Sequence, residues 1–376
     1  MINESVFSVK SFCNYKITIR SLVGNEIILS IQEDKHFGDY NIKMMDESYS
    51  FNYFNGDQNT ILIKCESSSN CNIDIIEKDI QIDQLYMAEH LRKGFYSELK
   101  KSNNIKDYYD DYLPVIFYGI WSKNDLDVLK KNKSLKIIIW TGGDINDAEY
   151  REIYIQNIVK NNVDEIKKLS KIKHISRTSF VNKSLVNFNL PYINLPYMTI
   201  DINQFEPITK GKSIYVYTSP YMELYYGSNY YDQIVEKYKD INFVFACCKQ
   251  AYDILLSKKN GISKKYLSKY NIKYYEKDIL INEIYPQCFV ALRLTIHDGM
   301  AYTVQELGLM GIKSIHNGDS PSSLNYKNLD DICSHIDNEL KTIGTCDSEL
   351  ANKVKKYLTL DKNFYNTCFY KNNIEK

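Results

Sequence analysis

The sequence carries no excess of charge of either sign. Its 47 lysine and arginine residues are balanced by 47 aspartate and glutamate residues. A balanced chain has no overall field that would draw it to nucleic acid or to an anionic membrane surface. We therefore expect no nucleic acid among its partners.

Long apolar runs are missing as well. No stretch approaches the roughly 20 apolar residues that a membrane-spanning helix needs, and the opening MINESVFSVK lacks the apolar segment of a signal peptide. The 9 cysteines include no C-x-x-C pair, which indicates reduced thiols rather than a disulfide framework. These absences predict a cytoplasmic protein without a transmembrane segment.

Tryptophan is scarce, with 2 residues against 33 tyrosines, whereas asparagine, isoleucine and lysine are frequent. This bias is typical of a protein from an AT-rich genome. It carries no information on chemistry, so the function must be sought in the order of the residues.

A length of 376 residues predicts two or three domains. Residues 1–83 alternate apolar and polar side chains, as β-strands do, for example in KITIR and EIILSIQ. YSFNYF and NTILIKC flank Asn55-Gly56-Asp57, which predicts a hairpin, and NIKMM with NIDII predicts a second strand pair. We interpret this region as a small β-rich domain. It either binds carbohydrate or a partner, or it is a structural or homo-oligomerisation module.

From residue 84 the pattern changes to apolar strands separated by helical stretches. Such βα units form parallel sheets that bind ligands at the carboxyl ends of their strands. The fold class is therefore α/β, with two Rossmann-like domains (84–207 and 208–376) that face a cleft. Strands are expected at 113–120, 135–140, 172–176 and 191–197, and, after a polar linker at 209–212, at 213–218, 241–248, 272–276 and 288–295.

The stretch ALRLTIHDGMAYTVQELGLMGIKSIHN (291–317) combines a strand, a tight loop and an amphipathic helix that Gly311 ends. Backbone N–H groups of such a loop and helix start suit a pyrophosphate, and Gly299 lets the chain approach it closely. Glu306 lies one turn into the helix, where a carboxylate can accept both hydroxyls of a ribose.

Asp298, seven intervening residues and Glu306 resemble the E-x7-E signature of retaining GT-B glycosyltransferases of the family 4 type, with aspartate in place of the first glutamate. The surroundings are similar too. LTIHDG at 294–299 resembles P-S-x-x-E-G, ELGLMG at 306–311 resembles E-A-M-A-x-G, and IDINQFEP at 200–207 resembles the family's interdomain link.

The resemblance covers residues 84–376. The segment LRLTIHDG (292–299) also resembles a divergent branch that includes chains from giant viruses and low-GC bacteria, which implies host cytoplasm if the chain is viral. The resemblance to the family implies that Glu306 holds the ribose of a nucleotide-sugar donor and that Asp298 contacts hydroxyls of the donor sugar. Gly299 and the backbone after it would cradle the phosphates. The donor, a UDP-sugar by preference, is a substrate, and we expect no separate cofactor and no metal.

One departure from the family concerns charge. The segment TSPYME (218–223) has none of the arginine and lysine residues that bind the diphosphate in the family. Arg293 is our candidate for the replacement, because it interrupts an apolar strand where an unpaired guanidinium would be costly to bury. A leaving diphosphate needs such stabilisation. The alternative is an arginine paired with a structural carboxylate such as Glu223.

Four further side chains are donor-site candidates. The hydroxyls of Thr218, Ser219 and Thr295 either donate to the donor or form turns. His297 either hydrogen-bonds the donor or points to solvent.

The first Rossmann-like domain supplies candidates for the acceptor. Gly142 and Gly143 follow an expected strand and permit close approach of a ligand. Asp144 either positions and deprotonates the acceptor hydroxyl or caps the next helix. Asp125 and Asp127 spell the D-x-D of metal-dependent transferases, but we interpret them as part of a solvated helix.

We therefore predict a glycosyltransferase that moves a sugar from a nucleotide-diphosphate sugar to a glycan or another hydroxyl acceptor, without a metal and with retention. Two alternatives stay open. One is a nucleotide-sugar epimerase of related fold, and the other is a catalytically inactive, sugar-binding paralogue.

Overall fold

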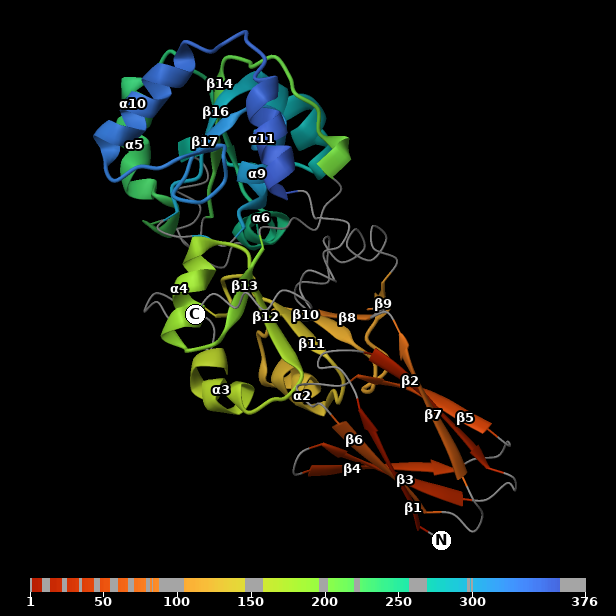
Figure 1. Ribbon diagram of the computed structural model, residues 1–376. Helices are drawn as coiled ribbons and strands as arrows, with labels where there is room; N and C mark the ends of the chain where they lie inside the picture. The colour runs from red at the N-terminus through yellow and green to blue at the C-terminus, as the bar shows by residue number, and fades with distance from the viewer. Residues whose placement is uncertain are drawn as a thin grey trace. The chain divides into compact units, whose positions relative to one another are not determined.

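The computed structural model of the chain (Figure 1) contains two compact units, which are described separately. The first includes Met1–Ser176 and Ser184–Asn194, and the second includes Arg177–Lys183 and Leu195–Leu360. The expected boundaries after residues 83 and 207 stay predictions. The structure describes residues 2–8, 14–21, 26–33, 36–43, 48–54, 60–66, 71–78, 82, 84–87, 105–145, 158–195, 202–219, 224–256, 269–295, 298 and 300–358.

The first seven strands form two antiparallel sheets. One has the order β1 (Ile2–Ser8), β6 (Thr60–Glu66), β3 (Glu26–Glu33), β4 (His36–Lys43), and the other β5 (Ser48–Phe54), β2 (Asn14–Ser21), β7 (Cys71–Lys78). In β2 the alternation works as expected, because Ile17 and Ile19 are buried while Lys16 and Arg20 are exposed.

Both strand pairings predicted in this region are wrong. β5 and β6 flank the Asn-Gly-Asp turn but belong to different sheets, since β5 pairs with β2 and β6 pairs with β1 and β3. Likewise β4 pairs with β3, and β7 pairs with β2. A turn signal marks where the chain reverses, whereas the partner of each strand depends on which sheet buries its apolar face.

A parallel sheet follows in the first unit, with the order β13-β12-β11-β10-β8-β9. Its central strands are buried along their whole length, as expected for a sheet covered on both faces. The strands are β8 (Gln84–Met87), β9 (Lys106–Asp107), β10 (Val115–Tyr118), β11 (Lys136–Ile139), β12 (Ile172–Ser176) and β13 (Tyr192–Asn194). The helices in this stretch of the chain are α2 (Lys123–Lys131), α3 (Ile158–Lys167) and α4 (Ser179–Asn187).

The second unit is built on another parallel sheet, with the order β15-β14-β16-β17-β18. The strands are β14 (Ser213–Tyr217), β15 (Phe243–Ala246), β16 (Cys288–Leu292), β17 (Lys313–Ile315) and β18 (Ser323–Leu324). The helices are η3 (Ile202–Gln204), η4 (Leu224–Tyr226), α5 (Ser228–Lys237), α6 (Lys249–Leu256), α8 (Lys277–Ile279), η5 (Leu280–Ile284), η6 (Tyr285–Gln287), α9 (Tyr302–Leu309), α10 (Leu329–Leu340) and α11 (Ser348–Leu358).

Two expectations for this unit have clear outcomes. The strand predicted at 272–276 is wrong, because only an isolated bridge from Lys273 to Ala246 forms there. The predicted helix end at Gly311 is confirmed, since its φ is +83° and a Cβ would lie 2.8 Å from the Asp347 carbonyl oxygen. Glycine therefore lets the α9 end meet the turn before α11, and the two helices pack together (Figure 1).

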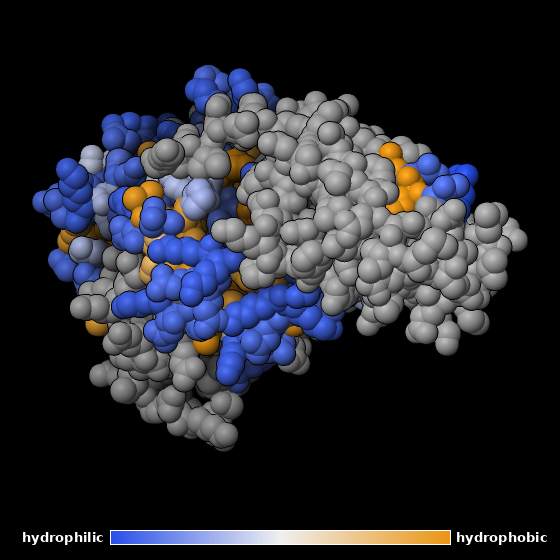
Figure 2. Space-filling model, turned by 60° about the horizontal axis from the view of Figure 1, so that its bottom comes forward, coloured by the Kyte–Doolittle hydropathy of each residue, from blue (hydrophilic) through white to orange (hydrophobic). Residues whose placement is uncertain are grey.

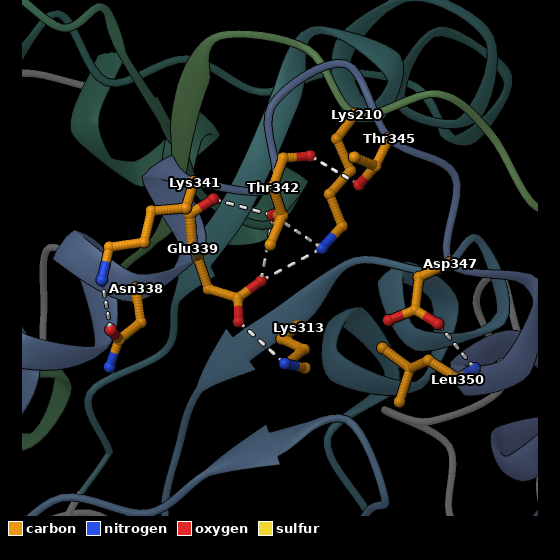
Figure 3. A network of polar contacts seen from close by, with 9 residues as sticks. All are labelled: Lys210, Lys313, Asn338, Glu339, Lys341, Thr342, Thr345, Asp347 and Leu350. Atoms are coloured by element: carbon orange, nitrogen blue, oxygen red, sulfur yellow. Dashed lines mark hydrogen bonds and ion pairs between the residues drawn. The ribbon is translucent and has the colours of Figure 1, made fainter.

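The residues expected to link two domains lie inside the second unit. Lys210 is buried, and its ammonium lies 3.0 Å from a Glu339 carboxylate oxygen in α10 (Figure 3). The other Glu339 oxygen lies 2.8 Å from the Lys313 ammonium, and Thr342 accepts a hydrogen bond from Lys210 at 3.0 Å. This cluster joins the segment before β14, the start of β17 and the end of α10.

The described part of the surface in Figure 2 is mostly hydrophilic, with small separate hydrophobic areas. Within the described ranges, no helix is long and apolar enough to cross a membrane.

Candidate functional site

The strand order of the second unit reverses beside β14. The chain passes from β14 outward to β15, returns on the other side of β14 as β16, and continues to β17 and β18. Ligands of open parallel sheets bind outside the carboxyl ends of the strands at such a switch point. Thr218 and Ser219 follow β14 there, and Arg293 and Thr295 follow β16. Four predicted donor-site residues therefore share one edge of the sheet.

Arg293 and Asp298 form an ion pair at this edge. The Nε of Arg293 donates to Asp298 Oδ2 at 2.7 Å, and Nη2 lies 2.7 Å from the same oxygen. Both side chains are partly accessible, at 11% for Arg293 and 19% for Asp298. The carboxylate that holds the arginine is thus a predicted site residue, whereas Glu223 lies outside the described residues.

Two tyrosines flank this guanidinium. Its central carbon lies 4.4 Å from the ring centre of Tyr217 and 5.7 Å from that of Tyr226. Burial alone would lower the pKa of Arg293, but the Asp298 carboxylate and both tyrosines raise it above its ordinary value. The arginine is therefore a fixed, permanently charged group at the switch point.

Thr295 and Thr218 are both fully buried. The Thr295 hydroxyl lies 3.4 Å from His316 Nδ1, which also lies 3.1 Å from the Arg293 carbonyl oxygen. The Thr218 amide donates to the Ala246 carbonyl at 2.9 Å and joins the ends of β14 and β15. These contacts hold the backbone after β14 and the backbone around Arg293 after β16. Ser219 is partly exposed at the same edge.

Glu306 lies in the second turn of α9, and its side chain meets a buried tyrosine. The Tyr285 hydroxyl donates to Glu306 Oε2 at 2.9 Å. Only 9% of Glu306 and 1% of Tyr285 are exposed. A carboxylate in such surroundings needs hydrogen-bond donors to stay charged, and Tyr285 is one of them.

Two predicted residues of the connecting loop, His297 and Gly299, lie outside the described residues. Their roles at the donor stay predictions. Asp298 between them and Met300 after them are described, so the structure gives the positions of these two residues before α9.

The acceptor candidates lie at the carboxyl end of β11 in the first unit. Gly142 has a φ of +97°, and Asp144 is buried. One Asp144 oxygen accepts from the amide and hydroxyl of Thr141 at 3.0 and 2.9 Å, and the other accepts from the Ile120 amide at 3.1 Å. Burial raises the pKa of Asp144 above its ordinary value. The side chain thus holds the loops after β10 and β11 together, with Gly143 between Gly142 and Asp144.

Asp125, the first residue of the D-x-D, accepts hydrogen bonds from other groups of the chain. Its carboxylate accepts from the Tyr86 hydroxyl at 2.8 Å and from the amides of Trp121 and Ser122 at 2.9 Å each. With Ser122 it forms the capping box of α2. It therefore lies in a helix, as predicted, but it is buried rather than solvated. Among the described residues, no cluster of three or more metal-binding side chains occurs.

Three tyrosines at the site, Tyr217, Tyr226 and Tyr285, do not stand out in the sequence. In a chain with 33 tyrosines, none of them is marked by its neighbours. The signal that does exist is position: Tyr217 ends an apolar strand, and Tyr285 precedes one by three residues.

No protein-family model matches the sequence, and no curated protein matches it. The chain is similar in structure to HepE of Anabaena in complex with UDP and glucose, with a TM-score of 0.51 and 8% identity over 74% of this chain and 96% of HepE. For HepE with UDP-glucose the TM-score is 0.50, with 9% identity over 73% and 87% of the two chains. At this identity the likeness shows the fold alone, a mixed α/β fold with parallel sheets like that of its GT-B neighbours.

Proposed function

We propose that the chain is a glycosyltransferase that moves a sugar from a nucleotide-diphosphate sugar, preferably a UDP-sugar, to a glycan or another hydroxyl acceptor. The observation that carries the proposal is the grouping at the second unit's switch point. Arg293, Asp298 and Glu306 come from consecutive parts of one strand-loop-helix segment, and two of them form a partly accessible ion pair.

The charges of this grouping suit a nucleotide sugar. The Arg293 guanidinium has five N–H groups, and Asp298 contacts two of its nitrogens, so the fork can also serve an anion. A diphosphate leaving group gains negative charge as the glycosidic bond breaks, and a fixed guanidinium lowers the barrier by stabilising it. We assign the leaving diphosphate to Arg293, with Gly299, Thr218, Ser219 and Thr295 beside it.

The two carboxylates suit hydroxyl groups. We assign the donor sugar to Asp298 and the ribose to Glu306, because a carboxylate accepts strong hydrogen bonds from neighbouring hydroxyls. His297 would lie beside the donor. The resemblance of Asp298-x7-Glu306 to retaining enzymes supports transfer with retention of configuration.

The acceptor would bind at the first unit's sheet, at the carboxyl end of β11. Gly142 and Gly143 leave room for a ligand near the backbone, and Asp144 holds the loop in place. The acceptor hydroxyl would be positioned by this loop, with Asp144 as its base.

Incubation with UDP-, GDP- and dTDP-sugars tests the proposal. Transfer to an added glycan or slow release of nucleotide diphosphate supports a glycosyltransferase. An epimerised sugar would instead indicate an epimerase, and saturable binding without turnover would indicate an inactive sugar-binding protein.

Glu306→Gln is expected to weaken binding of the nucleotide diphosphate by about 1–3 kcal/mol, because the ribose hydroxyls lose a charged acceptor. Isothermal titration of UDP measures the change. Glu349→Gln on the exposed face of α11 is the control and should leave affinity unchanged. Equal affinities of wild type and Glu306→Gln would remove the ribose assignment.

Activity is expected to survive EDTA. The Asp125 carboxylate already accepts three hydrogen bonds from the protein, and Arg293 offers positive charge for the diphosphate. The measurement is the rate of donor cleavage before and after chelation. Loss of that rate with recovery on adding Mn²⁺ or Mg²⁺ would show that a metal takes part.

A further inference from the structure

Tyr285 is the buried side chain that contacts Glu306. It lies in an irregular part of the chain, where the π-helical turn η5 passes into the 3-10 turn η6 with Pro286 in its second position. Helices of this kind often occur at functional sites because they redirect individual side chains. Here the turn directs Tyr285 into the protein, next to the start of β16.

The Tyr285 ring is held in place from the side. It packs edge to face against Tyr215 of β14, with ring centres 5.3 Å apart and an interplanar angle of 87°. Tyr215 lies opposite Ala291 of β16 in the sheet. The hydroxyl of Tyr285 therefore has a fixed position relative to the two strands of the switch point.

In the hydrogen bond between Tyr285 and Glu306, the tyrosine hydroxyl is the donor. Burial and the neighbouring Glu306 carboxylate raise the pKa of Tyr285 well above its ordinary value, so the hydroxyl keeps its proton and donates. The 2.9 Å contact holds Glu306 Oε2 beside the Tyr285 hydroxyl and so restricts rotation of the carboxylate. A carboxylate with restricted rotation loses less freedom when it meets the two adjacent hydroxyls of a ribose.

We propose that Tyr285 is a positioning residue that orients Glu306 toward the 2′- and 3′-hydroxyls of the donor ribose, and so makes the site select ribonucleotides over deoxyribonucleotides. This inference rests on the proposed function, since it deepens the role given there to Glu306. Tyr285 acts through the carboxylate and needs no contact with the nucleotide.

The test compares UDP with 2′-deoxy-UDP, and GDP with 2′-deoxy-GDP, by isothermal titration of the full chain. Wild type should bind the ribonucleotide of the preferred pair on the order of tenfold more tightly, because a lost hydrogen bond to a charged group is worth about that factor. In Tyr285→Phe the ratio should fall toward one, while affinity for the deoxynucleotide changes little. Combined with Glu306→Gln, the tyrosine change should have no further effect on the ratio.

Tyr238→Phe is the matched control. Tyr238 is also buried and donates to a carboxylate, Asp337, at 2.8 Å, but it lies at the end of α5, before β15 and away from the switch-point edge. It should leave the ratio unchanged even if thermal unfolding shows a loss of stability.

The outcomes separate the two proposals. If wild type binds none of the four nucleotides, the proposed preference for a UDP-sugar donor fails and this inference fails with it. If wild type discriminates between the members of a pair and Tyr285→Phe discriminates equally well, the inference alone is overturned.

Discussion

Arg293→Ala is expected to slow cleavage of the donor by about 100- to 1000-fold, the usual loss when one preorganised donor to a developing negative charge is removed. The effect should appear in hydrolysis by water as well as in transfer to an acceptor. Leaving-group stabilisation is needed whichever nucleophile attacks, so the loss cannot depend on the acceptor. Release of nucleotide diphosphate from a UDP-sugar measures it.

Two variants make this prediction specific. Arg293→Lys keeps the charge but loses the planar fork that meets Asp298 and stacks on Tyr217, so it should restore only part of the rate. Asp298→Ala should also impair both reactions, because the sugar loses its carboxylate and Arg293 loses its partner.

Asp144→Ala, in the first unit, is expected to affect a different step from the changes at Arg293 and Asp298 in the second unit. If the acceptor is bound in the first unit, transfer should fall while nucleotide affinity stays nearly unchanged, since positioning one hydroxyl contributes only when that hydroxyl is present. Loss of nucleotide binding in Asp144→Ala, or full activity in Asp298→Ala, would show that the roles of the two units are assigned wrongly.

Much of the fold could be predicted because parallel strands carry a local signal. IKHIS predicts a strand at 172–176, and β12 occupies these residues. The same signal fails for 272–276, where the side chains are suitable but only Lys273 finds a partner. Pairing is a property of two segments, so a single segment cannot establish it. In the region before residue 84, strands were likewise located correctly and paired wrongly.

One missed helix did leave a trace in the sequence. α10 begins after Asn328, whose side chain accepts from the Asp331 amide at 3.0 Å, and its first turn carries Asp330 and Asp331. Such a cap followed by acidic residues predicts a helix start. The rest of the segment, LDDICSHIDNEL, has the apolar spacing that a helix needs to pack on one face.

For the site, the sequence indicates which residues belong to it better than it indicates which side chains contact one another. It predicts that Arg293 needs a counter-charge, but the choice of Asp298 depends on the path of the loop between them. The contact of Tyr285 with Glu306 could not be predicted from the sequence for the same reason, because the two residues are 21 positions apart. Contacts of this kind arise only when the two segments are packed together in the folded chain.

Glu339→Ala is expected to destabilise the second unit by about 3–5 kcal/mol, the usual cost of leaving one partner of a buried ion pair alone. The side chains of Glu339 and Lys210 are only 4% and 1% exposed, so water cannot replace the lost carboxylate around Lys210. Lys313 is less affected because 31% of its side chain is exposed. Chemical denaturation of the full chain, followed by a probe in the second unit, measures the change.

The same carboxylate predicts a dependence on pH. Burial alone would raise the pKa of Glu339, but hydrogen bonds from Lys313 and Lys210 outweigh burial and hold it below its ordinary value. Stability gained from a lowered carboxyl pKa is present above the ordinary glutamate pKa of about 4.3 and is lost as the pH falls through the value in the folded state. Wild type should therefore lose stability on acidification more steeply than Glu339→Gln.

Two comparisons separate buried charge from simple loss of packing. Lys210→Met combined with Glu339→Leu should recover much of the stability, because the pair is replaced by apolar groups and no buried ammonium is left alone. Glu349→Ala removes an exposed partner of Lys353 and should barely change stability. If the double variant is no more stable than Glu339→Ala, the buried ammonium left alone in Glu339→Ala is not the source of the cost. If Glu339→Ala unfolds like wild type, the cluster in Figure 3 does not hold the segment before β14 in place.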